Sequence, residues 1–162
     1  MSMEDNAITQ ELIDSALGKD FDFGAVRISE VIPQRPPFVM VDSLVRFDAN
    51  GVETSFTVRE DNILLENGSL DPAGILENIA QSCAVRIGFI SKYILLRGVD
   101  IGYICAIRDM DIMRTPSVGE TLSTTVSVRD EIMGMTIVEA EVKSGRSLIA
   151  KGTMSTALKK ED

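Results

Sequence analysis

The side chains in this sequence that could do chemistry gather around one carboxylate. Glu77 is the only acid inside the apolar segment that follows Asp71, and Gln81 comes four residues later. In a helix this spacing places both side chains on one face. A carboxylate in such a position can transfer a proton or activate water. The alternative is that Glu77 is simply solvated in the first turn of a helix, where the dipole favours negative charge.

Metal and thiol chemistry are disfavoured. The sequence has no histidine, and its two cysteines, Cys83 and Cys105, lie in separate apolar runs. Their spacing suits neither a metal site nor a disulfide framework, so we expect no metal, no cofactor and a reducing, cytoplasmic setting. Cys83 comes six residues after Glu77, about 240° further round a helix, so this thiol is expected in the core.

Length and charge bound the remaining possibilities. A chain of 162 residues is expected to form one domain that buries roughly two-thirds of its unfolded surface. The net charge of -9 argues against nucleic acid or an anionic membrane as a partner. The first residues lack the pattern of a signal peptide, and Arg86 and Lys92 interrupt the most apolar stretch before it could span a bilayer. We therefore predict a soluble protein.

The element that must position Glu77 is a long helix over residues 71–96. Asp71 is a good N-cap, and Pro72 suits the first helical position. Apolar residues then recur at helical spacing, at Ile75, Leu76, Ile79, Ala80, Cys83, Ile87 and Ile94. A narrow stripe of an acid, an amide and two small residues could face a ligand or another helix: Glu77, Gln81, Ala84 and Gly88.

Alternating runs on either side of this helix predict strands. Before it, runs 38–48 and 52–59 flank Ala49-Asn50-Gly51, a sequence typical of a tight hairpin. After it come four runs, over 103–114, 120–129, 135–143 and 148–158. A sheet with one solvated face must be covered on the other, and only the central helix is long and apolar enough to do so. We therefore expect an α+β fold in which a six-stranded antiparallel sheet wraps around one long central helix.

The remaining segments are short. Residues 1–24 are polar and acidic, with a short amphipathic helix expected to end at Gly18. Asn67-Gly68 predicts a second tight turn just before the central helix. We expect residues 25–158 to form the single folded domain and residues 159–162 to form a polar tail.

Three segments carry a resemblance to a known family. IPQRPPFVMVDSLV at 32–45 is similar to its LPHRYPFLLVDRV segment, and GILENIAQ at 74–81 is similar to its helix with an acid, a hydrophobic pair and a glutamine. ICAIRDMDIMRTPSVGETL at 104–122 resembles its strand, proline and glycine–aspartate turn. In this order they resemble the hotdog-fold β-hydroxyacyl-(acyl carrier protein) dehydratases, over residues 28–158. The short loop before the helix is nearest to the aryl-polyene thioester dehydratases.

The resemblance implies a mechanism with one partner missing. In that family a histidine and an acid, contributed by opposite subunits of a dimer, remove water from a 3-hydroxyacyl thioester. Glu77 matches the acid, and Gln81 matches the glutamine that orients it. Gln34 occupies the place of the histidine, and a neutral amide cannot take up a proton near pH 7.

Four further residues are predicted to bind substrate from the same resemblance. The helix start at Ala73 and Gly74 would stabilise negative charge on the thioester carbonyl. Phe38 and Tyr103 would line the acyl site, although aromatic residues beside strands also pack a sheet against its helix. Scattered arginines could form a patch for an acidic carrier or could simply be solvated: Arg35, Arg46, Arg97, Arg108 and Arg114.

The missing histidine leaves the function open between classes. The first is a dehydratase of fatty acid or polyene synthesis with altered or impaired dehydration. The second is a non-catalytic partner subunit that binds acyl carriers beside a histidine-bearing dehydratase, and the third is an acyl thioesterase in which Glu77 activates water. In each case the expected partners are an acyl thioester, on acyl carrier protein or coenzyme A, and a second hotdog subunit in a homodimer or heterodimer.

Overall fold

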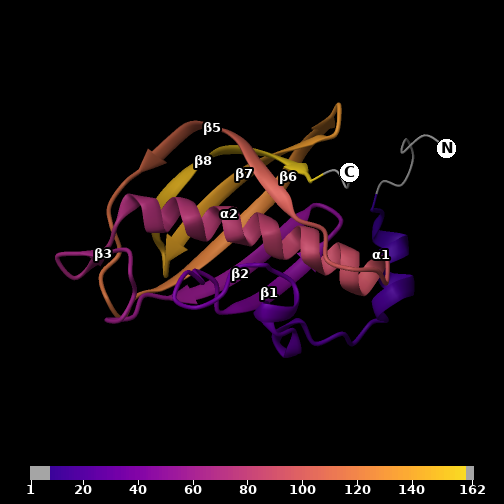
Figure 1. The fold of residues 1–162 in the computed structure, drawn as a ribbon, viewed down its shortest axis with the longest axis horizontal. Coiled ribbons are helices and arrows are strands. Elements are labelled where there is room, and N and C mark those ends of the chain that lie inside the picture. The colour runs from indigo at the N-terminus through magenta and orange to yellow at the C-terminus, as the bar shows by residue number, and fades with distance from the viewer. Residues whose placement is uncertain (1–7, 160–162) are drawn as a thin grey trace.

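A long helix, α2, crosses the concave face of a curved sheet in the computed structural model, which describes residues 8–159 (Figure 1). The sheet has six strands in the order β1-β2-β6-β7-β8-β5, and every pairing is antiparallel. These strands are β1 (Ser43–Asp48), β2 (Gly51–Thr57), β5 (Gly102–Ile112), β6 (Thr121–Ile132), β7 (Met135–Ser144) and β8 (Ser147–Leu158). The predicted α+β architecture, one sheet around one central helix, is confirmed.

The helix begins where the sequence predicts and changes form near its end. α2 spans Pro72–Phe89, and the Asp71 side chain accepts a hydrogen bond from the Ala73 N–H at 2.7 Å. A wider π turn, Ile90–Ile94, then replaces the expected last turns of regular helix. There the Ser91 hydroxyl donates to the Ile87 carbonyl at 2.9 Å. Such side-chain bonds compete with the regular backbone ladder, which is why periodicity alone did not show the change.

The predicted turns and buried faces are confirmed. Ala49 and Asn50 form the turn between β1 and β2. Asn67 and Gly68 join the short strands β3 (Leu65–Glu66) and β4 (Ser69–Leu70), and both have positive φ, 51° and 77°, as a type I′ turn requires. Four alternate residues along β2 and just after it are all buried against the helix: Val52, Thr54, Phe56 and Val58.

The first strand starts later than predicted. β1 begins at Ser43 rather than Phe38. The reason is that the backbone of the preceding segment is held by α2 and not by a strand, because Gln81 bonds both the Phe38 carbonyl and the Met40 N–H. Alternation of apolar residues cannot distinguish these two partners for an extended backbone.

The N-terminal helix docks on the main unit. α1 spans Gln10–Leu17, with Thr9 as its N-cap and Gly18 at φ 75° after its end, as predicted. Ile13 belongs to the hydrophobic core. Two 3-10 turns, Phe23–Ala25 and Ile28–Glu30, lead toward the sheet. Of the predicted polar segment and tail, residues 1–7 and 160–162 lie outside the described residues, and the domain limits at 25 and 158 stay a prediction.

β5 forms one edge of the sheet. Its register against β8 shifts twice, between Ile104 and Ala106 and between Arg108 and Asp111. Apolar side chains along it are exposed, and Ile107 is 44% exposed. An apolar edge strand of this length presents unpaired backbone groups to another strand.

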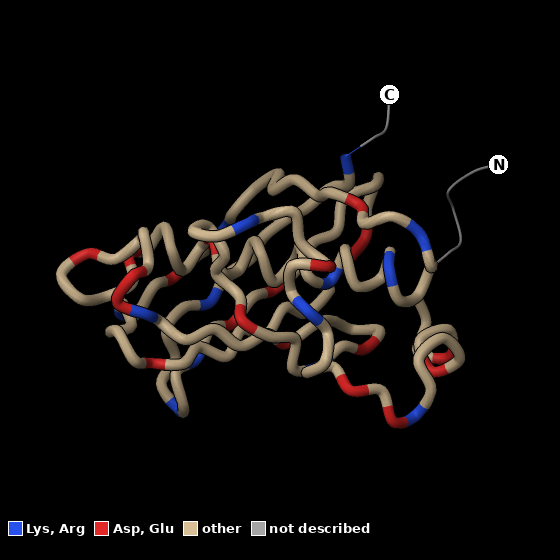
Figure 2. Tube along the Cα trace, turned by 60° about the horizontal axis from the view of Figure 1, so that its bottom comes forward, with Lys and Arg blue, Asp and Glu red and all other residues tan. Residues whose placement is uncertain are grey.

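Acidic and basic residues are both spread along the trace (Figure 2). The ion pair between Arg114 and Glu120 predicts a loop that is sensitive to acid. Glu120 accepts hydrogen bonds from Arg114 at 2.7 and 2.9 Å, from the Ser117 N–H and from the Ser144 hydroxyl. Arg114 first, and then the Ser117 N–H, lower the pKa of Glu120 from 4.5 to about 2. A carboxyl whose pKa is lowered by folding stabilises the fold above its unfolded pKa, and this contribution is lost as the pH falls through the folded value.

Glu120→Gln should therefore lower the free energy of unfolding near neutral pH, and the difference from wild type should shrink between pH 4.5 and about 2. Urea unfolding at several pH values measures this. Glu60→Gln removes the same charge from an exposed position and should give a small difference that does not follow this curve. An equally flat difference for Glu120→Gln would contradict the prediction.

Candidate functional site

Glu77 lies one turn from Gln81, and the two side chains are hydrogen-bonded. The Gln81 amide nitrogen donates to Glu77 Oε1 at 2.9 Å and to the Phe38 carbonyl at 2.7 Å. The Gln81 oxygen accepts from the Met40 N–H at 2.6 Å. Gln81 is fully buried and Glu77 is half-buried. Since one amide holds both the carboxylate and the 38–40 backbone, its orientation, and with it that of Glu77, is fixed.

A buried polar network connects these Gln81 hydrogen bonds to the sheet. Asn78 donates to the Met40 carbonyl at 2.7 Å and accepts from the Thr124 hydroxyl at 2.6 Å. One turn on, the hydroxyls of Ser82 and Thr54 lie 2.7 Å apart. Every one of these four side chains is fully buried, so their mutual pairing removes the cost of burying them. Sequence reasoning missed Asn78, although an amide in an apolar helix is itself a sign of a required partner.

The stripe of Glu77, Gln81, Ala84 and Gly88 contacts the segment 31–41 through Gln81 and Gly88. A Cβ added at Gly88 would lie 1.8 Å from the Val31 carbonyl oxygen, so the backbones touch there. The small residues of the stripe are therefore explained by the close approach of this segment, which also carries Gln34.

Gln34 has an unusual environment. Its side-chain oxygen has less than 1 Å² of exposed surface and finds no hydrogen-bond partner within residues 8–159. Within residues 8–159 of a single chain, Gln34 and Glu77 are not hydrogen-bonded to each other. A buried amide oxygen without a donor is costly, so this position stands out from the rest of the segment.

The N–H groups at the start of the helix, Ala73 and Gly74, make capping hydrogen bonds within the chain. The Ala73 N–H donates to the Asp71 side chain, and the Gly74 N–H donates to the Asp71 carbonyl at 2.8 Å. A Cβ at Gly74 would lie 2.5 Å from Leu70 Cδ1, so this glycine serves packing. Both N–H groups are engaged within one chain, and their role toward a thioester stays a prediction.

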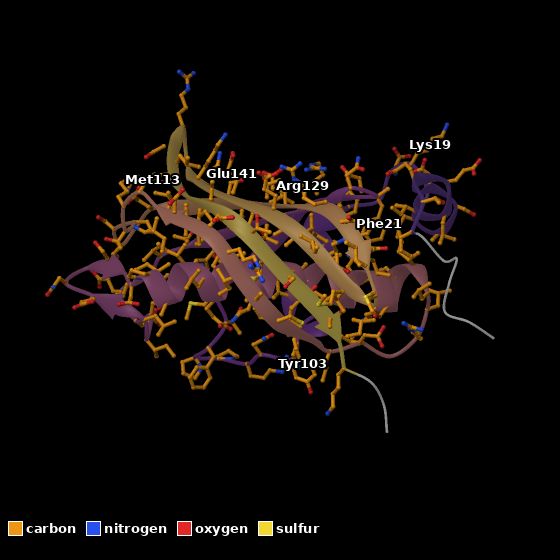
Figure 3. All side chains as sticks on the ribbon, turned by 90° about the horizontal axis from the view of Figure 1, so that it is seen from above. Lys19, Phe21, Tyr103, Met113, Arg129 and Glu141 are labelled. Carbon is orange, nitrogen blue, oxygen red and sulfur yellow. The ribbon has the colours of Figure 1, made fainter. Side chains whose placement is uncertain are left out.

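The two predicted acyl-site side chains are exposed in the single chain. Phe38 is 61% exposed and Tyr103 is 53% exposed. Figure 3 shows Tyr103 projecting outward from the start of β5. Met40, in contrast, is fully buried beneath the network around Asn78. The two aromatic side chains could therefore line a site only against a second molecule.

The other predicted groups have structural partners. Cys83 is buried and burial raises the pKa of its thiol to about 12, whereas Cys105 is exposed, and both thiols are free. Three of the five arginines are ion-paired within the chain, Arg46 with Asp48, Arg97 with Asp100 and Arg114 with Glu120. A role of the five arginines toward an acidic carrier stays a prediction.

The described part of the chain shows neither a metal-ligand cluster nor a membrane-spanning helix. No three histidine, cysteine or acidic side chains of residues 8–159 come together as metal ligands would. None of the helices described is long and apolar enough to cross a bilayer.

Comparisons with known proteins identify the fold and the family of this chain. No curated protein matches the sequence. Among solved structures, the dehydratase heterocomplex ApeI:P from Xenorhabdus doucetiae is similar, with a TM-score of 0.77 at 18% identity, covering 84% of this chain and 93% of that chain. The E. coli PaaI protein from the phenylacetic acid degradation operon has a TM-score of 0.56 at 16% identity, covering 70% and 80%.

A hypothetical thioesterase with coenzyme A from Streptococcus pneumoniae has a TM-score of 0.58 at 8% identity, covering 73% and 85% of the two chains. Likenesses at these identities show the fold, and the hotdog fold is confirmed. The family model for the ApeP dehydratase matches residues 26–161. This match spans most of the sequence and includes the helix that carries Glu77, and the chain therefore belongs to the ApeP-like dehydratase family.

Proposed function

We propose that this chain is the acid-bearing subunit of a 3-hydroxyacyl-thioester dehydratase whose general base comes from a second, histidine-bearing hotdog subunit. One observation carries the proposal: the Glu77 carboxylate is held by Gln81 in a sequence that has no histidine. The solved dehydratase heterocomplex with the same fold supports a second subunit. The two free thiols fit a reducing cytoplasm as its setting.

The chemistry divides between the two subunits. A base on the partner takes the proton next to the thioester carbonyl, and Glu77 protonates the departing hydroxyl, so that water leaves and a double bond forms. Glu77 must then be protonated at the start of each cycle. Gln81 can hold Glu77 in both its protonated and its ionised state. Its amide nitrogen donates to Glu77 Oε1 and does not accept the proton of the acid.

Assembly would use the β5 edge. The sheet ends there with exposed apolar side chains, and Tyr103 and Phe38 are exposed rather than packed in their own chain. A partner paired along β5 would cover this edge and could supply the donor that the buried oxygen of Gln34 lacks. The acyl thioester, on acyl carrier protein or coenzyme A, would bind where the two subunits meet.

Ile107→Lys should weaken subunit assembly, because a charge on the edge strand must be desolvated when that edge is covered. Sedimentation velocity should show a shift from dimer toward monomer at micromolar concentration. Val45→Lys, on the opposite edge strand β1, is the matched control because Val45 is 47% and Ile107 is 44% exposed. Equal effects of both changes would exclude β5 as the interface.

A subunit-complementation experiment tests the division of labour. Wild type carries Glu77 without a histidine, and Gln34→His/Glu77→Ala carries a histidine without the acid. Each protein alone should be inactive or slow on a 3-hydroxyacyl thioester of N-acetylcysteamine. Co-expressed with different tags and purified as the mixed dimer, they should form one complete site, with a gain of about a hundredfold.

The controls separate the possible outcomes. A mixed dimer of wild type with Gln34→Asn/Glu77→Ala has no base and should stay inactive. If Gln34→His alone is active while the mixed dimer is not, acid and base act within one chain, and the split site is wrong. If the mixed dimer forms and remains inactive, as does Gln34→His, Glu77 is not a catalytic acid.

Thioester hydrolysis is the second candidate, favoured by the same orientation of Glu77. A carboxylate held by an amide can activate water without a histidine. Release of free thiol from the same substrate measures it directly. Hydrolysis by wild type that is lost in Glu77→Gln, without any enoyl product, would replace the dehydratase proposal with a thioesterase.

A further inference from the structure

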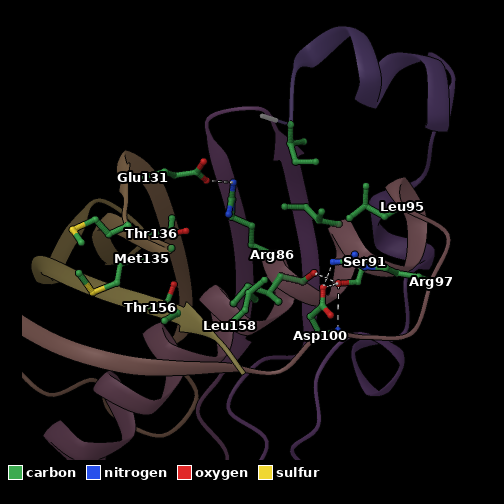
Figure 4. A pocket seen from close by; sticks show the side chains of 16 residues that line it. Arg86, Ser91, Leu95, Arg97, Asp100, Glu131, Met135, Thr136, Thr156 and Leu158 are labelled. Atoms are coloured by element: carbon green, nitrogen blue, oxygen red, sulfur yellow. Dashed lines mark hydrogen bonds and ion pairs between the residues drawn. The ribbon is translucent and has the colours of Figure 1, made fainter. Parts of the chain in front are cut away.

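A cavity lies on the face of α2 opposite Glu77. Arg86 follows Glu77 by nine residues, which is half a turn away round the helix. Its side chain reaches into a pocket of about 670 Å³ between the second half of α2, the β6–β7 turn and the end of β8 (Figure 4). This volume lies within the range of sites for small organic ligands. Glu77, Gln81 and Gln34 do not line it.

Arg86 is a buried cation with incomplete pairing. It is 9% exposed, and its Nε has less than 1 Å² of exposed surface and no acceptor within the described residues 8–159. Its one acidic neighbour there, Glu131, is 57% exposed and approaches Nη2 only to 4.0 Å. Burial lowers the pKa of Arg86, but a guanidinium stays protonated near pH 7. Cys83 gives no compensation, because burial keeps its thiol neutral.

The walls around Arg86 are mostly aliphatic. Ile87 and Ile90 come from the helix side, and Leu158 comes from the end of β8. At the rim, Asp100 is already paired with Arg97 and lies 3.0 Å from the Ser91 hydroxyl. The two rim carboxylates, Asp100 and Glu131, would repel a second negative charge on a ligand. The pocket thus combines one unfilled position for an acceptor with hydrocarbon walls.

We propose that this pocket binds a free aliphatic carboxylic acid. The carboxylate accepts from the terminal nitrogens Nη1 and Nη2 of Arg86, replacing the long contact to Glu131. The hydrocarbon chain lies against Ile87, Ile90 and Leu158. A buried guanidinium gains most from such a charged, paired acceptor, and a ligand with a single negative charge meets less repulsion from the two rim carboxylates than one with two charges. The site is independent of Glu77 and of the proposed dehydratase function.

Titration calorimetry with decanoate as the probe tests the site. Decanoate should bind the full chain, and 1-decanol, which has the same chain length and no charge, should bind at least about tenfold more weakly. Arg86→Met should lose decanoate binding by a similar factor. A methionine of similar volume can replace a buried cation without loss of stability, so this variant is expected to fold. Arg97→Met, at the exposed rim, should retain binding.

Further variants decide between the outcomes. Should Arg86→Met not fold, Leu158→Trp decides, since its indole would fill the pocket from a half-exposed position and should weaken binding at least about tenfold. Absence of decanoate binding, equal binding of decanol, or binding unchanged in Arg86→Met or Leu158→Trp would overturn the proposal.

Discussion

Gln34→His should raise the rate at which the purified chain dehydrates a 3-hydroxyacyl thioester by about a hundredfold or more. The imidazole, with an unperturbed pKa of about 6.5, supplies a base at the position where the family carries one. Glu77 remains in place, oriented by Gln81, to protonate the leaving hydroxyl. Formation of the 2-enoyl thioester, followed over a range of pH, measures the gain. The rate should rise as the pH passes about 6.5, because only the neutral imidazole accepts a proton.

Two variants control for other effects at this position. Gln34→Asn keeps an amide and should leave the rate at the wild-type level. Gln34→His/Glu77→Ala should lose the gain, because the departing hydroxyl then lacks its acid. A Gln34→His protein that folds and still binds acyl thioester, yet dehydrates no faster than wild type, would leave the chain as a binding subunit only.

Gly88→Ala should lower the free energy of unfolding by about 3 kcal/mol, the upper end of what overpacking costs. The added Cβ would lie 1.8 Å from the Val31 carbonyl oxygen and 2.6 Å from its carbon. Neither atom can rotate away, since both belong to the backbone. The helix and the segment 31–41 must therefore separate, which also strains the Gln81 bonds to Phe38 and Met40. Urea unfolding measures the loss.

Gly98→Ala is the matched control for Gly88→Ala. A Cβ at Gly98 would meet nothing within 4 Å, so this change should alter stability little. In Gly88→Ala, hydrogen exchange of the Met40 N–H should also become faster, because that bond depends on the same contact. Wild-type stability in Gly88→Ala would mean that the helix and the segment do not touch as described.

Local chemistry explains why parts of the fold could be predicted from sequence. The start of α2 depends on Asp71 and Pro72, which are adjacent to the turn that they stabilise. The Asn67-Gly68 turn requires positive φ at both residues, which this pair adopts easily. The alternation in β2 fixes which side chains face the helix. In each case the cause lies within a few residues of the effect.

The site was only partly predictable, because its contacts join distant segments. Gln81 bonds a backbone 41 residues earlier, and Thr124 reaches Asn78 from 46 residues later. No local pattern records such pairings, so the start of β1 was placed too early and the role of Asn78 was missed. Arg86 read as an interruption of an apolar helix, and its burial follows only from the packing of the β6–β7 turn over it.

The two register shifts in β5 limit which extended segments can pair with this edge of the sheet. A straight, regular edge would accept almost any extended segment, including those of unfolded proteins in a crowded cell. A strand that pairs with β5 must instead change register at matching places, near Ala106 and near Asp109, where φ is 51°. Few sequences meet that condition. The irregular edge therefore disfavours pairing with arbitrary strands, as in amyloid-like ladders, although its side chains are apolar. It still allows pairing with a partner strand of matching register.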